Sequence, residues 1–376
     1  MKLFKCQHCE QMLYFENTTC ERCSHRLGFI PEIMNLSALE PQGQASQGQA
    51  SQGQASQGDV WRALAVDKKL YRFCANTAFD VCNWMIEAEK TDRYCAACRH
   101  NRTVPDTGVA DNVGAWRKIE IAKHRLFYTL MKLNLPLDKC NPDGSTRLAF
   151  DFLASPAQAG GSRVMTGHDN GLITLALEEA DDAEREKRRT QMHEPYRTLL
   201  GHFRHEVGHY FWDVLVRDGG LIEPCRQIFG DERMDYGAGL QTYYANGAPP
   251  NWQDNFISAY ATSHPWEDFA ETWAHYLHIV DTLEMARALG MYVHPRLARP
   301  GELDAQVDFD PYTVRDPSPL IQTWVPLSNA LNSLNRTMGL LDIYPFVLSP
   351  PVVEKLSAIH HLVHGNPLSV KAEQAA

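Results

Sequence analysis

Cysteine spacing is the feature that most constrains the fold of this chain. Eight of the ten cysteines form two groups of four within the first hundred residues. The first group consists of two CxxC pairs, Cys6 with Cys9 and Cys20 with Cys23, separated by ten residues. Four thiolates at this spacing can bind one tetrahedral Zn²⁺ at about 2.3 Å each.

The segment between these pairs favours a zinc ribbon. Residues 12–15 (MLYF) have the character of a short strand. A unit of about 30 residues cannot build a sufficient core, so a bound metal has to replace it. A redox-active CxxC pair is the alternative, and it would require a thioredoxin-like setting.

The second group consists of Cys74, Cys82, Cys95 and Cys98. Only the last two form a CxxC pair, so spacing alone leaves two interpretations open. They are a second structural zinc site, or buried thiols packed among apolar neighbours such as Trp84. Two further cysteines are isolated, and we expect them to be ordinary core or surface thiols: Cys140 and Cys225.

Composition and charge exclude several classes of protein. The net charge is −10, with 36 Lys plus Arg against 46 Asp plus Glu, which disfavours a protein that coats nucleic acid or an anionic membrane. The N-terminus lacks an apolar signal segment, and no 18-residue apolar run predicts a membrane span. We therefore expect a cytoplasmic protein, in which disulfides are disfavoured.

A low-complexity tract separates the two cysteine groups. Residues 44–58 are three copies of QASQG, which contain no apolar side chain larger than Ala. Such a tract predicts a flexible linker or insertion. The two groups therefore belong either to distinct modules or to one composite module with the tract looped out.

Residues 90–125 are locally basic, with eight Lys or Arg against four Asp or Glu. A solvated helix face is the favoured interpretation, because residues 116–133 have helical periodicity, and nucleic-acid contact is the alternative.

The second half of the chain contains an HExxH motif, formed by His205, Glu206 and His209. Apolar residues recur at three- and four-residue steps from 199 to 214, which predicts one amphipathic helix with Pro195 in its first turn and residues 219–220 (GG) after its end. The two imidazoles then lie one turn apart and can share a zinc ion. Glu206 would act as the general base.

A hydrolytic zinc needs a third protein ligand and an open fourth position. Residues 264–276 predict a second helix that starts at Pro265 and carries Glu267 and Glu271 one turn apart. We assign Glu267 as the ligand and Glu271 as the acceptor that orients a ligand histidine, although the reverse stays open. Tyr260 is our choice for stabilising the oxyanion, with three rivals: Tyr236, Tyr243 and Tyr244.

Several other polar residues are weaker candidates. His202 and Asp213 flank the motif and could approach the metal or orient a ligand, or serve packing and solvation only. His168 lies in a glycine-containing loop and could line a cleft. We expect His275 and His278, later on the second helix, to be structural.

Further elements follow from periodicity and from Pro and Gly punctuation. Residues 147–153 and 172–177 predict strands of a small sheet before the motif helix. Residues 318–340 and 350–363 predict helices of a C-terminal lobe, and residues 371–376 a frayed end.

These motifs together resemble a family of bacterial proteins that have an N-terminal zinc ribbon and a zinc-binding metallopeptidase domain. The resemblance covers nearly the whole chain. It rests on both cysteine groups and on residues 27–29 (LGF), 166–168 (TGH), 196–210 and 264–271 (HPWEDFAE). The QASQG tract departs from the family pattern.

The resemblance implies a zinc at the second cysteine group as well. An HExxH motif followed by a tyrosine and a glutamate on a later helix is similar to the gluzincin class, and more distantly to toxin peptidases of the lethal-factor type. In those enzymes a tyrosine shortly before the ligand glutamate faces the zinc, which supports Tyr260.

The sequence thus predicts an α+β fold, with N-terminal zinc-ribbon modules followed by a mainly helical zincin-like metallopeptidase domain that includes a small β-sheet. We expect a zinc ribbon at 1–40, a linker at 41–58, a second cysteine module at 59–110, the metallopeptidase domain at 111–365 and a flexible tail at 366–376.

The predicted function is a metallopeptidase acting on peptides or proteins, with one catalytic and one or two structural Zn²⁺. We expect neither a nucleic-acid nor a membrane partner. The alternative is a non-catalytic adaptor for a protein or nucleic-acid partner, in which His202 or Asp213 closes the metal site as a fourth ligand. A metal-dependent hydrolase of a small substrate is a third hypothesis.

Overall fold

The computed structural model describes residues 2–42, 60–155, 164, 166–191, 197–296, 299 and 303–368. The QASQG tract, Pro195, Tyr196 and residues 369–376 of the predicted tail lie outside the described residues. The chain divides into two compact units. Unit 1 comprises residues 1–132, 136–167 and 172–186, and unit 2 comprises residues 133–135, 168–171 and 187–376.

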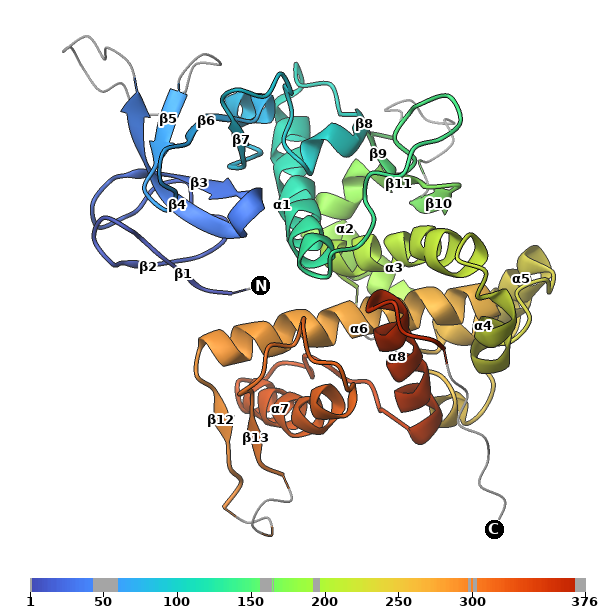
Figure 1. Cartoon of the computed structure of the whole chain (residues 1–376). Helices are drawn as coiled ribbons and strands as arrows, with labels where there is room; N and C mark the ends of the chain where they lie inside the picture. The colour runs from blue at the N-terminus through green and yellow to red at the C-terminus, as the bar shows by residue number, and fades with distance from the viewer. Residues whose placement is uncertain are drawn as a thin grey trace. The chain divides into compact units, whose positions relative to one another are not determined.

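Unit 1 contains a two-stranded sheet and a five-stranded antiparallel sheet. Strands β1 (Phe4–Lys5) and β2 (Met12–Leu13) pair within the first cysteine group. The larger sheet has the order β3-β4-β5-β6-β7, and its strands are Arg26–Ile30, Asn35–Gln42, Val60–Ala63, Leu70–Phe73 and Met85–Glu87. Figure 1 shows these strands in blue.

The five-stranded sheet settles the relation between the two cysteine groups. Strand β4 pairs with β5 across the low-complexity tract, with Gln42 opposite Val60. Residues 41 and 42, which the sequence assigned to the linker, therefore end a strand. The tract interrupts a β-hairpin of one composite module, so the prediction that left two arrangements open is resolved.

One aromatic core supports this composite module. Phe15, from the first cysteine segment, lies 4.9 Å from the ring centroid of Phe29 on β3. Phe29 lies 4.7 Å from Trp84, in the second cysteine segment. Tyr128 lies 5.5 Å from Phe15 and belongs to helix α1 (Ala110–Lys132). The two cysteine segments and α1 therefore share one hydrophobic core.

The rest of unit 1 is a small parallel sheet. Strand β9 (Ala149–Leu153) lies between β8 (Asn101–Thr103) and β11 (Leu172–Ala176) and is parallel to both. This confirms the strands expected at 147–153 and 172–177. Strand β10 (Gly167–Asp169) and helix α2 (Asp182–Gln191) each span a boundary between the units.

Basic residues of the 90–125 segment face acidic partners in unit 1. Arg102 pairs with Asp151 and Arg125 with Glu16, the latter at 2.6 Å. Arg117 lies 3.1 Å from Asp80. These pairs favour the interpretation of a solvated, charge-balanced surface over a nucleic-acid interface.

Unit 2 is mainly helical and is built around one long buried helix. Helix α6 (Pro265–Ala288) begins at the residue that the sequence predicted. It packs against α3 (Leu199–Phe211), α4 (Ile222–Phe229), α7 (Ser318–Thr337) and α8 (Pro350–Val363) (Figure 1). The remaining elements are α5 (Tyr236–Asn246), β12 (Tyr292–Val293) and β13 (Ala305–Gln306).

The C-terminal helices confirm the sequence prediction to within a few residues at their ends. In contrast, α1 starts before the expected residue 116, at Ala110. Among the described helices, none combines the length and the apolar character that a membrane crossing requires.

Candidate metal centre

Helix α3 carries the HExxH motif and starts later than predicted. The Thr198 side chain caps the helix by accepting a hydrogen bond from Gly201 N at 3.0 Å. The helix therefore begins at Leu199, and Pro195, expected in its first turn, lies outside the described residues. After Phe211 the chain widens into a π-helix, Trp212–Arg217, and the predicted glycine pair follows it.

A histidine cap and a proline fix the start of α6, which carries the acidic residues. The His264 side chain accepts a hydrogen bond from Trp266 N at 3.1 Å, and its Nε2 lies 3.0 Å from the Met234 carbonyl oxygen. Pro265 occupies the first turn, where its missing N–H costs nothing. The first turn of α6 therefore has a defined position, with Glu267 buried in it.

Helices α3 and α6 approach each other closely at Gly208, inside the motif. A Cβ atom at this position would lie 3.0 Å from Ala270 Cα and 3.3 Å from Ala270 O. Only a residue without a side chain fits this distance without shifting the backbone. The glycine thus lets the histidines of one helix face the glutamates of the other.

Three donor groups converge between the helices. Glu267 Oε2 lies 3.0 Å from His205 Nε2 and 3.6 Å from His209 Nε2, and the three ligand atoms all lie within 4.8 Å of one another. Two ligands held about 2.1 Å from a tetrahedral zinc lie about 3.4 Å apart. The observed separations bracket this value, so the three groups fit a zinc ion.

An unused acceptor supports this fit. Glu267 is 1% exposed, and its Oε2 accepts no hydrogen bond from the described residues although an imidazole nitrogen lies 3.0 Å away. Buried carboxylate oxygens are normally satisfied. The oxygen and the ring nitrogens therefore point toward a common space rather than at one another, as metal ligands do.

Glu271 contacts the far side of a ligand histidine. Its Oε1 lies 2.7 Å from His205 Nδ1, and Ser258 Oγ donates a hydrogen bond to its Oε2 at 2.5 Å. A carboxylate on Nδ1 fixes the tautomer that leaves Nε2 as the donor to a metal. This geometry supports the order of roles expected for Glu267 and Glu271.

His209 is oriented by packing. Its ring lies 4.0 Å from that of Trp266 and 5.8 Å from that of His168. Its Nδ1 is buried and has no hydrogen-bond partner in the part of the chain that the structure describes. His168 Nε2 accepts a hydrogen bond from Gly171 N at 2.8 Å. The His168 ring therefore lies beside the centre, but its Nε2 is engaged by the backbone.

The charges at the centre perturb one another. Burial disfavours the imidazolium of His205 and lowers its pKa. The hydrogen bonds and negative charges of Glu267 and Glu271 exceed this effect and raise the pKa of His205 well above its usual value. Burial opposes the carboxylate of Glu267, yet the two imidazoles hold the pKa of Glu267 well below its usual value. Burial raises the pKa of Glu206.

Two tyrosines lie next to the ligands. Tyr260, in the short helix η7 (Tyr260–Ser263), has its ring 5.9 Å from His205. Burial raises the pKa of Tyr260, so its hydroxyl keeps its proton. Tyr236, which the sequence offers as an alternative to Tyr260 for stabilising the oxyanion, donates a hydrogen bond from its hydroxyl to Glu267 Oε1 at 2.6 Å.

The remaining candidates have other partners. Asp213 pairs with Arg217 at 2.8 Å. His275 Nδ1 lies 2.8 Å from the Tyr344 hydroxyl, and His278 Nδ1 lies 3.3 Å from the guanidinium of Arg204. Among the described residues, neither His202 nor Asp213 joins the three-donor group.

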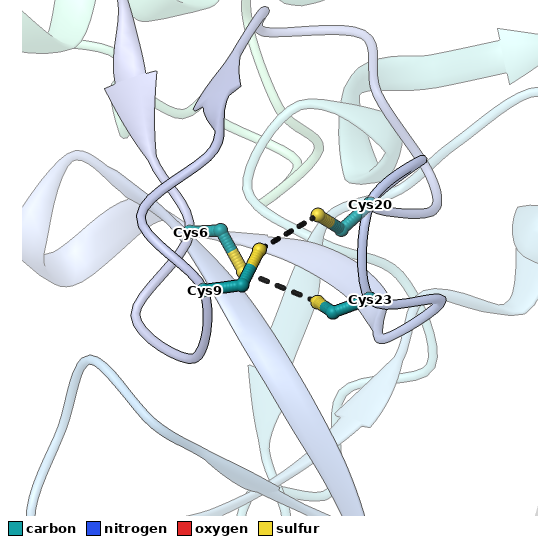
Figure 2. A group of neighbouring side chains, drawn as sticks. All are labelled: Cys6, Cys9, Cys20 and Cys23. Atoms are coloured by element: carbon teal, nitrogen blue, oxygen red, sulfur yellow. Dashed lines mark hydrogen bonds between the residues drawn. The ribbon is translucent and has the colours of Figure 1, made fainter.

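The first cysteine group forms a compact cluster. Figure 2 shows two loops that present their sulfurs to one another, with Cys6 Sγ 3.7 Å from Cys23 Sγ and Cys9 Sγ 3.5 Å from Cys20 Sγ. These distances exclude disulfides, which require about 2.05 Å. They are close to the roughly 3.8 Å expected between sulfurs on one tetrahedral zinc.

The second cysteine group also converges. All four side chains are buried, and their sulfurs lie within 4.8 Å of one another: Cys74, Cys82, Cys95 and Cys98. Of the two isolated cysteines, Cys140 is exposed and Cys225 is buried. Convergence of the four thiols favours a metal site over dispersed apolar packing.

Comparison with known proteins also separates a cysteine-rich N-terminal region from a region that contains the HExxH helix. A zinc-ribbon domain family matches residues 3–109, and a family described as "Putative zinc-binding metallo-peptidase" matches residues 112–362. The two matches meet near residue 110, where the sequence predicted a boundary, whereas α1 belongs to the same compact unit as the cysteine groups. The sequence-based domain limits therefore stay a prediction.

The chain also has relatives of nearly the same length. It is 38% identical over 367 residues to an uncharacterized protein of Mycobacterium tuberculosis, covering 96% of this chain and 95% of that one. An uncharacterized protein of Mycobacterium bovis matches to the same extent. No solved structure matches the chain. With its ribbon region and its HExxH helix, the chain belongs to the family described as "Putative zinc-binding metallo-peptidase".

Proposed function

We propose that the protein is a zinc-dependent metallopeptidase of the gluzincin type, acting on peptides or proteins. One observation carries the proposal: His205, His209 and Glu267 converge as three donors, and no fourth protein donor joins them in the described part of the chain. Three protein ligands with an open position are typical of catalytic zinc, whereas structural sites are closed by four.

The residues take distinct roles. When bound, zinc supplies a Lewis acid that lowers the pKa of a water molecule toward 7 and polarises the scissile carbonyl. Glu271 holds the tautomer of His205, and Tyr236 holds Glu267 in place. Glu206 accepts the proton of the attacking water and delivers it to the leaving amine. Burial raises the pKa of Glu206, which favours its acting first as base and then as acid.

Tyr260 is the proposed oxyanion donor. Its phenol keeps its proton, and its ring lies beside His205. A hydroxyl aimed at the developing negative charge contributes in the transition state rather than in the ground state. Tyr236 fits this role less well, because its hydroxyl already donates to Glu267.

The adaptor alternative depends on a closed metal site. Asp213 was one source of a fourth ligand, and its carboxylate pairs with Arg217 instead. His202 does not join the ligand group of the described residues. The open geometry therefore favours catalysis over a scaffold role.

Replacing Glu206 tests the proposal. We expect Glu206→Gln to lower peptide turnover by about 10²- to 10⁴-fold, since it removes the general base, while zinc content and melting temperature stay near wild type. Cleavage of a peptide library, read by mass spectrometry, gives the rates. Glu223→Gln, at an exposed position of α4, is the matched control. A Glu206→Gln protein with the wild-type rate would refute the assigned mechanism.

A further inference from the structure

The second cysteine cluster has donor groups beyond its four thiols, and both come from α1. His124 Nε2 lies 3.4 Å from Cys82 Sγ and 3.7 Å from Cys98 Sγ. Glu120 Oε2 lies 3.9 Å from Cys98 Sγ. Glu120 is fully buried and His124 is 4% exposed, so both side chains approach the thiols in the protein interior.

These separations match those of ligands on one metal ion. A sulfur at about 2.3 Å and a nitrogen at about 2.0 Å from a tetrahedral zinc lie about 3.5 Å apart. Cys98, Glu120 and His124 form a second group whose ligand atoms lie within 4.8 Å of one another. Cys98 belongs to both groups. In the described part of the chain, the first cysteine cluster has no such neighbouring group.

The carboxylate of Glu120 is held in a fixed orientation. Trp116 Nε1 and Asn101 Nδ2 donate to its Oε1, at 2.9 and 2.6 Å. Lys123 Nζ lies 2.9 Å from Oε2, the oxygen that faces Cys98. Carboxylates that bind metals are commonly oriented by such outer hydrogen bonds.

Charge balance points the same way. Metal binding deprotonates thiols, so the four cysteines, Glu120 and the fully buried Lys123 together carry four net negative charges. One divalent ion would leave two of them uncompensated in a buried site, which is unfavourable. A second divalent ion would neutralise the cluster. In the first cluster, Cys9 and Cys23 are partly exposed, and solvent can compensate a remaining charge.

We propose that this region holds two divalent ions, with Cys74, Cys82, Cys95 and Cys98 around one Zn²⁺ and Cys98, Glu120 and His124 around a second, the Cys98 thiolate being shared. The donor set of sulfur, imidazole and carboxylate suits zinc. Because α1 lies in the metallo-peptidase match and the cysteines in the ribbon match, the second ion would join segments of the two matched regions.

Counting metal tests this assignment. The parent for the experiment is the His205→Ala/His209→Ala protein, which lacks the HExxH donors. It is loaded with zinc chloride, desalted and measured by mass spectrometry of the metal. We expect three zinc ions per chain in the parent, two after His124→Ala, and three again after His124→Cys, which restores a donor. His8→Ala, an exposed histidine beside the first cluster, is the matched control and should keep three.

Two zinc ions in the parent, or equal counts in the parent and the His124→Ala protein, would overturn the proposal. His124 would then be a hydrogen-bond donor to the Cys82 thiolate of a single zinc site. Should His124→Ala fail to fold, the parent substituted with ¹¹³Cd decides by NMR. Two of its three signals should be split by mutual coupling through the shared sulfur, and two unsplit signals alone would refute it.

Discussion

Gly208 offers a test of how closely the metal centre depends on helix packing. Gly208→Ala adds one methyl group at the crossing of α3 and α6, where it would lie 3.0 Å from Ala270 Cα. Carbon atoms prefer separations of about 3.5 to 4.0 Å. The obstructing atom is backbone, so the helices have to separate by a few tenths of an ångström.

Two effects on stability oppose each other in this variant. Alanine is favoured over glycine inside a helix by about 1 kcal/mol, while overpacking costs about 1–3 kcal/mol. We therefore expect a net loss of about 1 kcal/mol in the free energy of unfolding without metal. Zinc tolerates ligand displacements of only about 0.2 Å, so zinc affinity at the histidine site should fall by at least about tenfold.

Urea unfolding in the presence of a chelator measures the free energy of unfolding without metal. Competition with a chelator measures the zinc affinity. The His205→Ala/His209→Ala protein gives the baseline that the cysteine clusters contribute. Gly114→Ala in α1 is the matched control. Beyond its chain neighbours and the backbone of its own helix, no atom of the described residues lies within 4 Å of the added methyl group, so this variant should stabilise the protein slightly and leave zinc affinity unchanged. Unaltered affinity in Gly208→Ala would refute the role assigned to this crossing.

Three further perturbations follow from the structure of unit 2. Tyr236→Phe removes the donor to Glu267 and should weaken zinc binding by about tenfold in the same competition assay, whereas wild-type affinity would show that the hydrogen bond is dispensable. Burial lowers the pKa of His360 to about 4, below the roughly 6.5 of the unfolded chain. The unfolded state therefore binds the proton first as the pH falls, and about 3 kcal/mol of stability should be lost between pH 7 and pH 4. Urea titrations should show a smaller loss for His360→Gln, and an equal loss would contradict this assignment. Lys355→Met leaves the buried Asp268 unpaired and should cost about 3 kcal/mol at pH 7, most of which Asp268→Asn in the same chain should restore. A double variant as unstable as the single one would count against this explanation.

The helices of the metal centre could be predicted from local sequence. The period of apolar residues in α3 and α6, together with Pro265, identifies both helices, because each signal lies within one element. A helix places residues four apart on one side, which accounts for the expectations for His205 and His209. Two helix-start signals lie close together before the motif, a proline at position 195 and the capping residue Thr198, and the prediction followed the proline.

Contacts between distant segments could not be predicted. Glu120 and His124 lie 22 and 42 residues from the cysteines that they face, and only the packing of α1 brings them together. The pairing of β4 with β5 across the QASQG tract was undecided for the same reason. Tyr236 lies 31 residues before Glu267, and no local pattern showed that its hydroxyl would reach this carboxylate.

The central claim is that His205, His209 and Glu267 bind a zinc ion with an open position. The most direct measurement compares the zinc content of the wild-type protein with that of the His205→Ala/His209→Ala variant, both loaded and desalted in the same way. The account predicts a difference of one zinc ion per chain, whatever the cysteine clusters hold. Equal zinc content in the two proteins would contradict it.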